Sequence, residues 1–269
     1  MKLGFIGSGK MASALVKGVL QAGICNPGDI TISDTYGEAA TKLAGATGVR
    51  AVDANRRVVD SSDVIVLAVK PGDAIDLLKE LSSGAGDSGS KLLISIAAGL
   101  TLERLENAAG SGFRVVRVMP NTPALILQGA AAFASGSKAT SEDDALTRRI
   151  FEAVGVVAKV KEELLDAVTG LSGSGPAYIY TVIEALADGG VLMGLPRELA
   201  LQLAAKTVAG AAGMVLQSGE HPAQLRDQVT SPGGTTIAGL EALENSGLRS
   251  ALIHAVRAAT ERSYELRQS

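Results

Sequence analysis

The chain has 269 residues, of which 46% are hydrophobic and 20% charged, and its formal net charge is −3. This length allows two modest domains, and the composition is typical of a globular protein. Its basic residues are dispersed, which argues against a nucleic-acid partner and against an anionic membrane surface. Cys25 is the only cysteine, so an intrachain disulfide and a cysteine-based metal cluster are excluded.

The N-terminus gives no sign of secretion. It begins MKLGFIG, without the long apolar segment of a cleaved signal peptide. We also expect no apolar run in the chain to reach the length of a membrane span. The sequence therefore predicts a cytoplasmic protein with no membrane partner.

The first part of the chain alternates short apolar runs with helical segments. Continuous apolar runs, typical of strands buried on both faces, occupy 3–7, 29–33, 63–69, 91–97 and 114–119. Helical spacing between them predicts helices at 11–23, 38–44, 71–81 and 102–109. Edge strands are expected at 129–135 and 154–160, around a helix whose Ser141 and Asp144 resemble a capping box. This alternation predicts a doubly wound α/β sheet.

The second part of the chain shows only helical spacing. The predicted helices are 162–171, 176–194, 196–217, 234–245 and 247–267. We therefore expect a Rossmann-like dinucleotide-binding domain over 1–160 and an all-α domain over 161–269. The helices of the second part are apolar around most of their circumference, which favours burial against a second subunit.

A dinucleotide fingerprint follows the first predicted strand. Residues 7–12 read GSGKMA, the GxGxxA form of this motif. Gly7 allows the tight turn, Gly9 lets the backbone approach a pyrophosphate, and Ala12 permits close packing of helix on strand. Because the motif opens a helix within a βαβ unit, we expect it to bind a cofactor and not to serve as a purely structural turn.

Two further residues lie at the ends of predicted strands. Asp34 follows the second strand, where a carboxylate would bond the adenosine ribose hydroxyls and repel a 2′-phosphate. A solvated turn residue is the alternative for Asp34. Lys70, in AVKP (68–71), falls at the carboxyl edge of the sheet, where open α/β folds bind ligands. A surface lysine is the alternative there.

The stretch TSPGGTTIAGLEAL (230–243) is unusual within the helical part. It places hydroxyls and two glycines directly before an apolar helix. Free N–H groups and the helix dipole can hold an anion at such a loop, although an ordinary capped turn is the alternative.

Read together, these motifs resemble the Δ1-pyrroline-5-carboxylate reductase family. The residues that carry the match are GFIGSGKMA (4–12), AVKP (68–71), SIAAG (95–99), MPNTP (119–123), VTGLSGSGPAY (168–178), EALADGGV-MGLP (184–196) and TSPGGTTIAGL (230–240). The resemblance covers essentially the whole chain, in order. It implies an N-terminal Rossmann-like domain and a helical C-terminal domain that forms a homodimer, with rings of dimers in some members.

The resemblance also implies the reaction. Family members reduce 1-pyrroline-5-carboxylate to L-proline, the last step of proline biosynthesis, by hydride transfer from NADP(H) and/or NAD(H). The protonated ring imine is already a good hydride acceptor, so position matters more than acid–base groups. Thr236 matches the family position whose hydroxyl faces the imine nitrogen, and is the catalytic candidate. The small-molecule substrate would contact Lys70, Ser172, Ser174, Gly175, Ser231, Gly233, Gly234 and Thr235.

The expected cofactor contacts lie along the first part of the chain. They are Ile6, Gly7, Ser8, Gly9, Lys10, Met11, Asp34, Asn55, Ala68, Val69, Lys70, Pro71, Ala97, Ala98, Asn121 and Thr122. The family mostly prefers NADPH, whereas Asp34 favours NADH, so the preference stays open. We expect no metal site.

Three other readings remain. The first is a related Rossmann reductase that acts on a different imine or on a 3-hydroxy acid. A hydroxy-acid enzyme would need a Lys or His base beside the reacting carbon, and the SPGGTT and SGSGPAY loops supply neither. A nucleotide sensor without turnover would keep GSGKMA but would not need the hydroxyl-rich loop at 231–236. A purely structural helical oligomer does not explain the fingerprint.

Overall fold

The computed structural model describes residues 1–82 and 91–268. These residues divide into two compact units. Unit 1 comprises Met1–Ser174 together with Ala259–Ser269, and unit 2 comprises Gly175–Ala258. The functional boundary expected between residues 160 and 161 stays a prediction.

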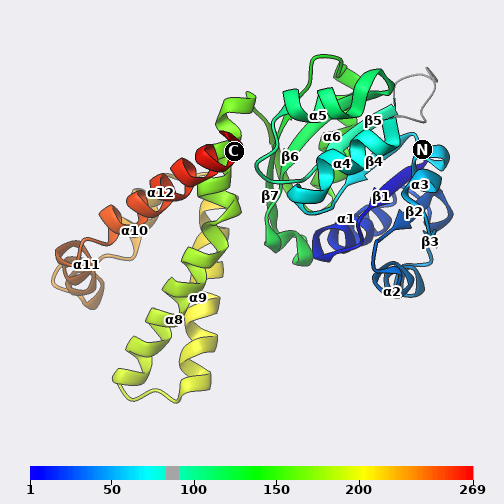
Figure 1. The fold of residues 1–269 in the computed structure, drawn as a ribbon. Coiled ribbons are helices and arrows are strands. Elements are labelled where there is room, and N and C mark those ends of the chain that lie inside the picture. Colours follow the sequence, from blue (N-terminus) through cyan, green and yellow to red (C-terminus); the bar gives the residue numbers. More distant parts are fainter. Residues whose placement is uncertain (83–90, 269) are drawn as a thin grey trace. The chain divides into compact units, whose positions relative to one another are not determined.

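Unit 1 contains one eight-stranded sheet (Figure 1). Its strands are β1 (Leu3–Ile6), β2 (Ile30–Ser33), β3 (Arg50–Ala51), β4 (Val64–Leu67), β5 (Lys91–Ser95), β6 (Phe113–Met119), β7 (Gly129–Ser135) and β8 (Gly155–Lys159). The strand order is β3-β2-β1-β4-β5-β6-β7-β8. All neighbours are parallel except β6 and β7, which pair antiparallel. The predicted doubly wound sheet is therefore confirmed.

Helices cover both faces of this sheet. They are α1 (Lys10–Gln21), α2 (Gly37–Thr47), α3 (Asn55–Ser61), α4 (Pro71–Ser82), α5 (Leu102–Ala109), α6 (Ser141–Glu152) and α7 (Leu165–Val168). Successive strand residues enter opposite cores, because side chains alternate along a strand. Phe5 packs in the core under α1 and α6, whereas Ile6 packs in the core under α3, α4 and α5. Both side chains are fully buried.

The short elements β3 and α3 of unit 1 were not expected from the sequence, nor was α10 (Pro222–Gln228) of unit 2. The strand β3 has two residues, and α3 has seven. Both carry too few apolar residues for a clear period, and pairing with β2 defines β3.

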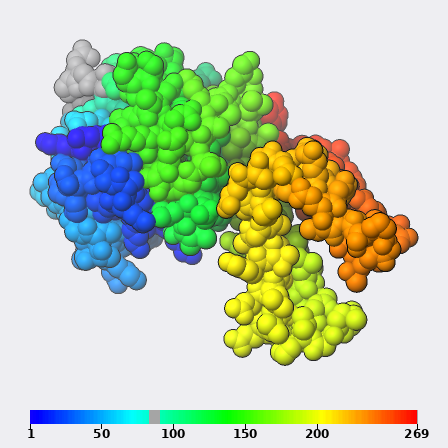
Figure 2. Space-filling view, turned by 180° about the vertical axis from the view of Figure 1, so that it is seen from behind, coloured from blue at the N-terminus to red at the C-terminus, as the bar shows by residue number. Residues whose placement is uncertain are grey.

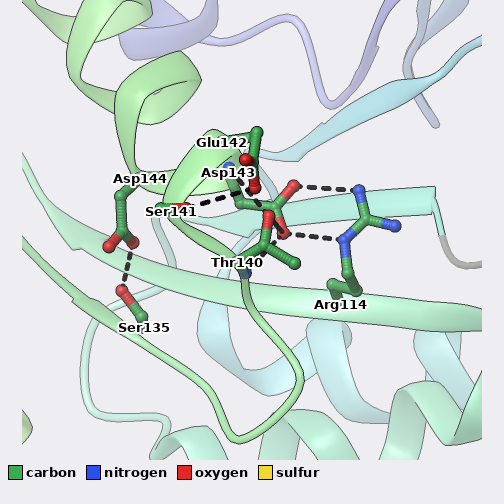
Figure 3. Close-up of polar contacts among 7 residues, drawn as sticks. All are labelled: Arg114, Ser135, Thr140, Ser141, Glu142, Asp143 and Asp144. Atoms are coloured by element: carbon green, nitrogen blue, oxygen red, sulfur yellow. Dashed lines mark hydrogen bonds and ion pairs between the residues drawn. The ribbon is translucent and has the colours of Figure 1, made fainter.

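The start of α6 corrects the predicted capping box by one residue (Figure 3). Thr140, not Ser141, is the N-cap, and its hydroxyl accepts from the backbone N–H of Asp143. The carboxylate of Asp143 accepts in return from the Thr140 N–H at 2.9 Å. Asp144 instead accepts from the hydroxyl of Ser135 on β7. The run TSEDD offers two hydroxyls and adjacent acids, so its spacing alone fits either register.

Unit 2 is entirely helical. It holds α8 (Gly175–Leu192), α9 (Arg197–Ser218), α10 (Pro222–Gln228), α11 (Thr235–Asn245) and the first part of α12 (Leu248–Gln268). The helices α8 and α9 lie side by side as a hairpin (Figures 1 and 2). In this unit, which the structure describes completely, the buried hydrophobic residues are three alanines: Ala187, Ala200 and Ala204.

The expectation that no apolar run reaches the length of a membrane span is wrong for α9. By length and composition, α9 is long and apolar enough to cross a membrane, with a mean hydropathy of 1.5. Its Ala, Leu and Val content is responsible, and only 11% of the most apolar window is buried within the chain. A single helix of this kind is weak evidence for a span, because an apolar helix that packs on another subunit passes the same test.

Candidate functional site

The glycine loop lies where the strand order reverses. In open α/β sheets ligands bind at this point, outside the carboxyl ends of the strands. Here β1 separates β2 from β4, and Ile6 is in register with Leu67. Gly7 has φ +96°, and a Cβ at this position would lie 2.6 Å from the Ala68 carbonyl oxygen. Only glycine fits this turn, so the backbone takes the conformation that the fingerprint requires.

The next glycine leaves room for a ligand. Gly9 is the N-cap of α1, and a Cβ built on it meets nothing within 4 Å. Among the described residues, no side chain caps this helix, so the backbone N–H groups of its first turn remain for an anion. Lys10 is exposed beside them and Met11 half-buried. Open space, free donors and a positive dipole end suit a pyrophosphate.

Asp34 is bound directly to the glycine loop. Its Oδ2 accepts from the Ser8 N–H at 2.6 Å and from the Ser8 hydroxyl at 2.8 Å. Its Oδ1 accepts from the Tyr36 N–H at 2.8 Å. Burial raises the pKa of Asp34, but these hydrogen bonds outweigh it and hold the pKa below its usual range. The carboxylate is therefore a fixed negative charge beside the loop, and its role as a cofactor contact stays a prediction.

A second polar pair lies beside Asp34. The buried Ser33 hydroxyl donates to Asn55 Oδ1 at 2.7 Å. Asn55 begins α3, the helix that the sequence did not predict, and is half-buried there. Asp34 and Asn55 thus both lie next to the carboxyl end of β2, where an adenosine ribose would be expected.

The loops after β4 and β5 bring more of the predicted residues to the same edge. Ala68 and Val69 are half-buried, and Lys70 is exposed directly before α4. Ala97 is buried and Ala98 exposed after β5. A pocket of about 480 Å³ opens here in unit 1. It is lined by Pro71, Gly72, Ala98, Gly99, Leu100, Arg104, Thr169, Ser174, Ala259, Arg262, Ser263 and Leu266.

The end of β6 meets the segment that follows α7. Asn121 is 9% exposed, whereas Thr122 is exposed. The Asn121 Nδ2 donates to the Ser172 carbonyl at 3.0 Å. Ser172 belongs to a π-helical turn, η5 (Thr169–Gly173), and Ser174 follows it. The structure therefore places Asn121 and Ser172, which are 51 positions apart, in direct contact.

The hydroxyl-rich loop lies in unit 2, before α11. Gly233 has φ +66°, and Gly234 is the N-cap of α11. The Gly234 N–H donates to the Ser231 carbonyl at 3.1 Å, which closes the turn. Among the described residues no side chain caps α11, although Thr235 and Thr236 stand in its first turn. Gly234 has no side chain with which to cap the helix, so the N–H groups of the first turn have no side-chain acceptor and can hold an anion.

The predicted residues thus fall in two groups. The expected cofactor contacts, with Ser172 and Ser174, belong to unit 1. Gly175 and the loop from Ser231 to Thr236 belong to unit 2. Across the described residues, no group of His, Cys, Asp and Glu could hold a metal ion.

The sequence did not predict one buried polar network of unit 1, which joins β6 to α5. Arg117 on β6 is 3% exposed and donates to Glu162 Oε1 at 2.9 Å. The same oxygen accepts from the Leu102 N–H at 2.7 Å. Glu162 therefore ties β6 to the start of α5. An arginine inside the apolar strand RVVRVM was the available signal, because a buried guanidinium requires a partner.

Comparison with known proteins gives matches over both parts of the chain. A family model described as pyrroline-5-carboxylate reductase dimerisation matches residues 162–266. A model described as NADP oxidoreductase, coenzyme F420-dependent, matches residues 2–99. The pyrroline-5-carboxylate reductase of Methanosarcina acetivorans is 50% identical over 98% of this chain and 97% of its own length. That of Arabidopsis thaliana is 48% identical over 100% of this chain and 96% of its own length.

Solved structures give the same result. A pyrroline-5-carboxylate reductase from Coxiella burnetii has a TM-score of 0.93 and 36% identity, covering 100% of this chain and 99% of its own. The Plasmodium falciparum enzyme, solved with NADP bound, has a TM-score of 0.85 and 37% identity over 99% of this chain and 98% of its own.

Proposed function

Because this chain belongs to the pyrroline-5-carboxylate reductase family, we propose that it reduces 1-pyrroline-5-carboxylate to L-proline, the last step of proline biosynthesis. The observation that carries the proposal is the match over nearly the whole chain to reductases of that name. The uncapped glycine loop at the strand-order reversal supports it, because hydride transfer requires a bound dinucleotide. The proposed location is the cytoplasm, with residues 1–160 acting as the dinucleotide domain and 161–269 as the substrate and dimerisation domain.

The residues of unit 1 fit a dinucleotide. Bound NAD(P)H supplies the hydride. The N–H groups after Gly9 would hold its pyrophosphate, and Asp34 and Asn55 would hold the adenosine ribose. Asp34 is already ionised and fixed by Ser8 and Tyr36, so it disfavours a 2′-phosphate by charge. The proposal therefore includes use of NADH as well as NADPH.

The substrate carboxylate would bind at the start of α11. The N–H groups after Gly234 and the hydroxyls of Ser231 and Thr235 are the donors there. Thr236, half-buried in the first turn, would present its hydroxyl to the imine nitrogen. Ser174, in the Ser172–Ser174 wall of unit 1, is a further proposed substrate contact. These groups orient the ring and exclude water, which is enough for an imine that arrives protonated.

The assembly is a homodimer through the C-terminal helices. Large apolar side chains of α8 and α9 are exposed in the single chain, including Leu186 at 49%, Leu203 at 49% and Leu216 at 76%. A surface this apolar is normally covered by a partner. The family model for dimerisation spans the same helices. We include a ring of dimers in the proposal as the further assembly.

The direct test is steady-state oxidation of NADPH and of NADH, each with racemic pyrroline-5-carboxylate. Turnover with either cofactor supports the proposed function, and the ratio of the two kcat/KM values gives the cofactor preference. A folded protein that binds dinucleotide but gives no turnover would instead favour a nucleotide sensor.

The Thr236 hydroxyl gives a sharper test. We expect Thr236→Ala to lower kcat by roughly tenfold to a thousandfold, the range for loss of one positioned donor. Dinucleotide affinity should stay within about twofold. Thr230→Ala is the matched control, because the Thr230 hydroxyl donates to the Arg226 carbonyl within unit 2. Unchanged kinetics in Thr236→Ala would remove this residue from the mechanism.

A further inference from the structure

Asn121 occupies the position expected to line the nicotinamide, yet the protein itself uses both ends of its amide. The Oδ1 accepts from the Ala130 N–H at 2.8 Å, and the Nδ2 donates to the Ser172 carbonyl at 3.0 Å. The opposite amide orientation would set oxygen against oxygen and N–H against N–H, so the network fixes the assignment. The side chain is 9% exposed.

The chemistry of the turn explains why a donor is needed there. In a continuous α-helix the Ser172 carbonyl would accept from the N–H four residues later, but residue 176 is proline and has no N–H. The chain adopts the wider turn η5 at this point, closed by the Ser174 N–H on the Thr169 carbonyl at 2.8 Å. The Asn121 amide thus supplies the hydrogen bond that Pro176 cannot.

A second contact joins the same two segments. A Cβ built on Gly173 would lie 2.7 Å from the Met119 Cε, so the turn packs closely on the end of β6. The hydroxyl of Ser172 is also engaged, donating to the Val168 carbonyl at 2.9 Å. The backbone of η5 is therefore held from β6 and from its own helix.

We propose that Asn121 is a positioning residue, which sets the Ser172–Ser174 wall against the loop at 119–123 and does not bind the cofactor through its amide. This inference rests on the proposed function, because the wall matters only if Ser174 faces the substrate. A displaced wall misplaces the imine relative to the hydride donor, while the glycine loop and Asp34 still hold the dinucleotide.

The test compares Asn121→Asp with Asn121→Ala. Aspartate keeps the acceptor for Ala130 but sets a second oxygen against the Ser172 carbonyl. At pH 8 we expect kcat/KM for pyrroline-5-carboxylate to fall on the order of 10- to 100-fold in both variants. The dinucleotide dissociation constant, measured by titration, should stay within about twofold. As pH falls, the aspartate takes up a proton and can donate to Ser172, so its activity relative to wild type should recover. The alanine variant should show no recovery.

Two results would overturn the inference. Parallel weakening of dinucleotide binding and of kcat/KM in both variants would make Asn121 a cofactor ligand. A wild-type kcat/KM in both variants would show that Asn121 has no role in the reaction. Asn107→Asp, at an exposed asparagine of α5, controls for the added charge. If Asn121→Asp does not fold, Asn121→Ala carries the kinetic test alone: a loss of kcat/KM with unchanged dinucleotide affinity supports the positioning role, and wild-type kcat/KM contradicts it.

A ligand-free measurement separates this inference from the proposed function. Hydrogen exchange of the amides over 169–174 should be faster in Asn121→Asp than in wild type at pH 8, whatever the substrate is. If wild-type protein gives no turnover but the two proteins still differ in exchange, only the proposed function is contradicted. Equal exchange rates in the two proteins would contradict the positioning role of Asn121.

Discussion

The two compact units bury their apolar side chains in different ways. Unit 1 encloses its own, since strand residues such as Phe5 and Ile65 are inaccessible under helices on both faces. The buried hydrophobic residues of unit 2 are three alanines, and leucines of α8 and α9 are exposed, including Leu192 at 85%. A helix pair has one shared seam, so an apolar surface on all sides needs another partner. The first unit is complete within one chain, and the second is half of an interface.

The largest effect should come from charging that interface. Leu199 and Leu203 lie one turn apart on α9 and are 41% and 49% exposed. We expect the double variant Leu199→Glu, Leu203→Glu to be monomeric by light scattering, because burying two unpaired carboxylates is costly. Val156→Glu, on β8 at 64% exposure, is the matched control in unit 1 and should leave the oligomer intact. A fully assembled double variant would contradict this role of α9.

The internal core of unit 1 gives the next effect. Phe133 on β7 is completely buried, and Phe133→Ala should lower the free energy of unfolding by about 3–5 kcal/mol, the cost of a large core truncation. Val156→Ala, in the neighbouring strand, should change it by less than about 0.5 kcal/mol. Urea unfolding followed by circular dichroism measures both. Equal losses in the two variants would mean that burial within this chain does not set the stability of unit 1.

The smallest effect concerns the ion pair at the start of α6 (Figure 3). Arg114 donates to Asp143 at 2.7 and 2.9 Å, and the carboxylate is 4% exposed. Burial raises the pKa of Asp143, but bonds from Arg114 and Thr140 outweigh it, so the folded-state pKa lies below 3.8. A lowered pKa stabilises the fold above the unfolded value, and this stability is lost as pH falls through the folded one.

We therefore expect the melting temperature of wild type to fall more steeply below about pH 4 than that of Asp143→Asn. Melting curves between pH 6 and pH 3 measure the two slopes. Parallel slopes would show that Asp143 titrates alike in the folded and unfolded chain.

The C-terminal end of the chain illustrates what only the tertiary structure reveals. Helical spacing predicted the last helix, but not that residues from Ala259 onward belong to unit 1. The buried Asp166 accepts from the Ser263 hydroxyl at 2.8 Å, and Arg267 lies 3.2 Å from its other oxygen as an electrostatic contact. These partners are about 100 positions apart, and no local pattern connects them.

The sequence by itself determined the elements of the fold, the glycine loop and the family. Each depends on residues close together in the sequence: the apolar periods of strands and helices, a glycine motif directly after a strand, and contiguous family motifs. The tertiary structure decided how polar side chains are used. It bound Asp34 to Ser8, paired Arg117 with Glu162, and turned Asn121 toward Ser172. A hydrogen bond depends on where distant segments meet, and that meeting is set by the packing of the whole unit.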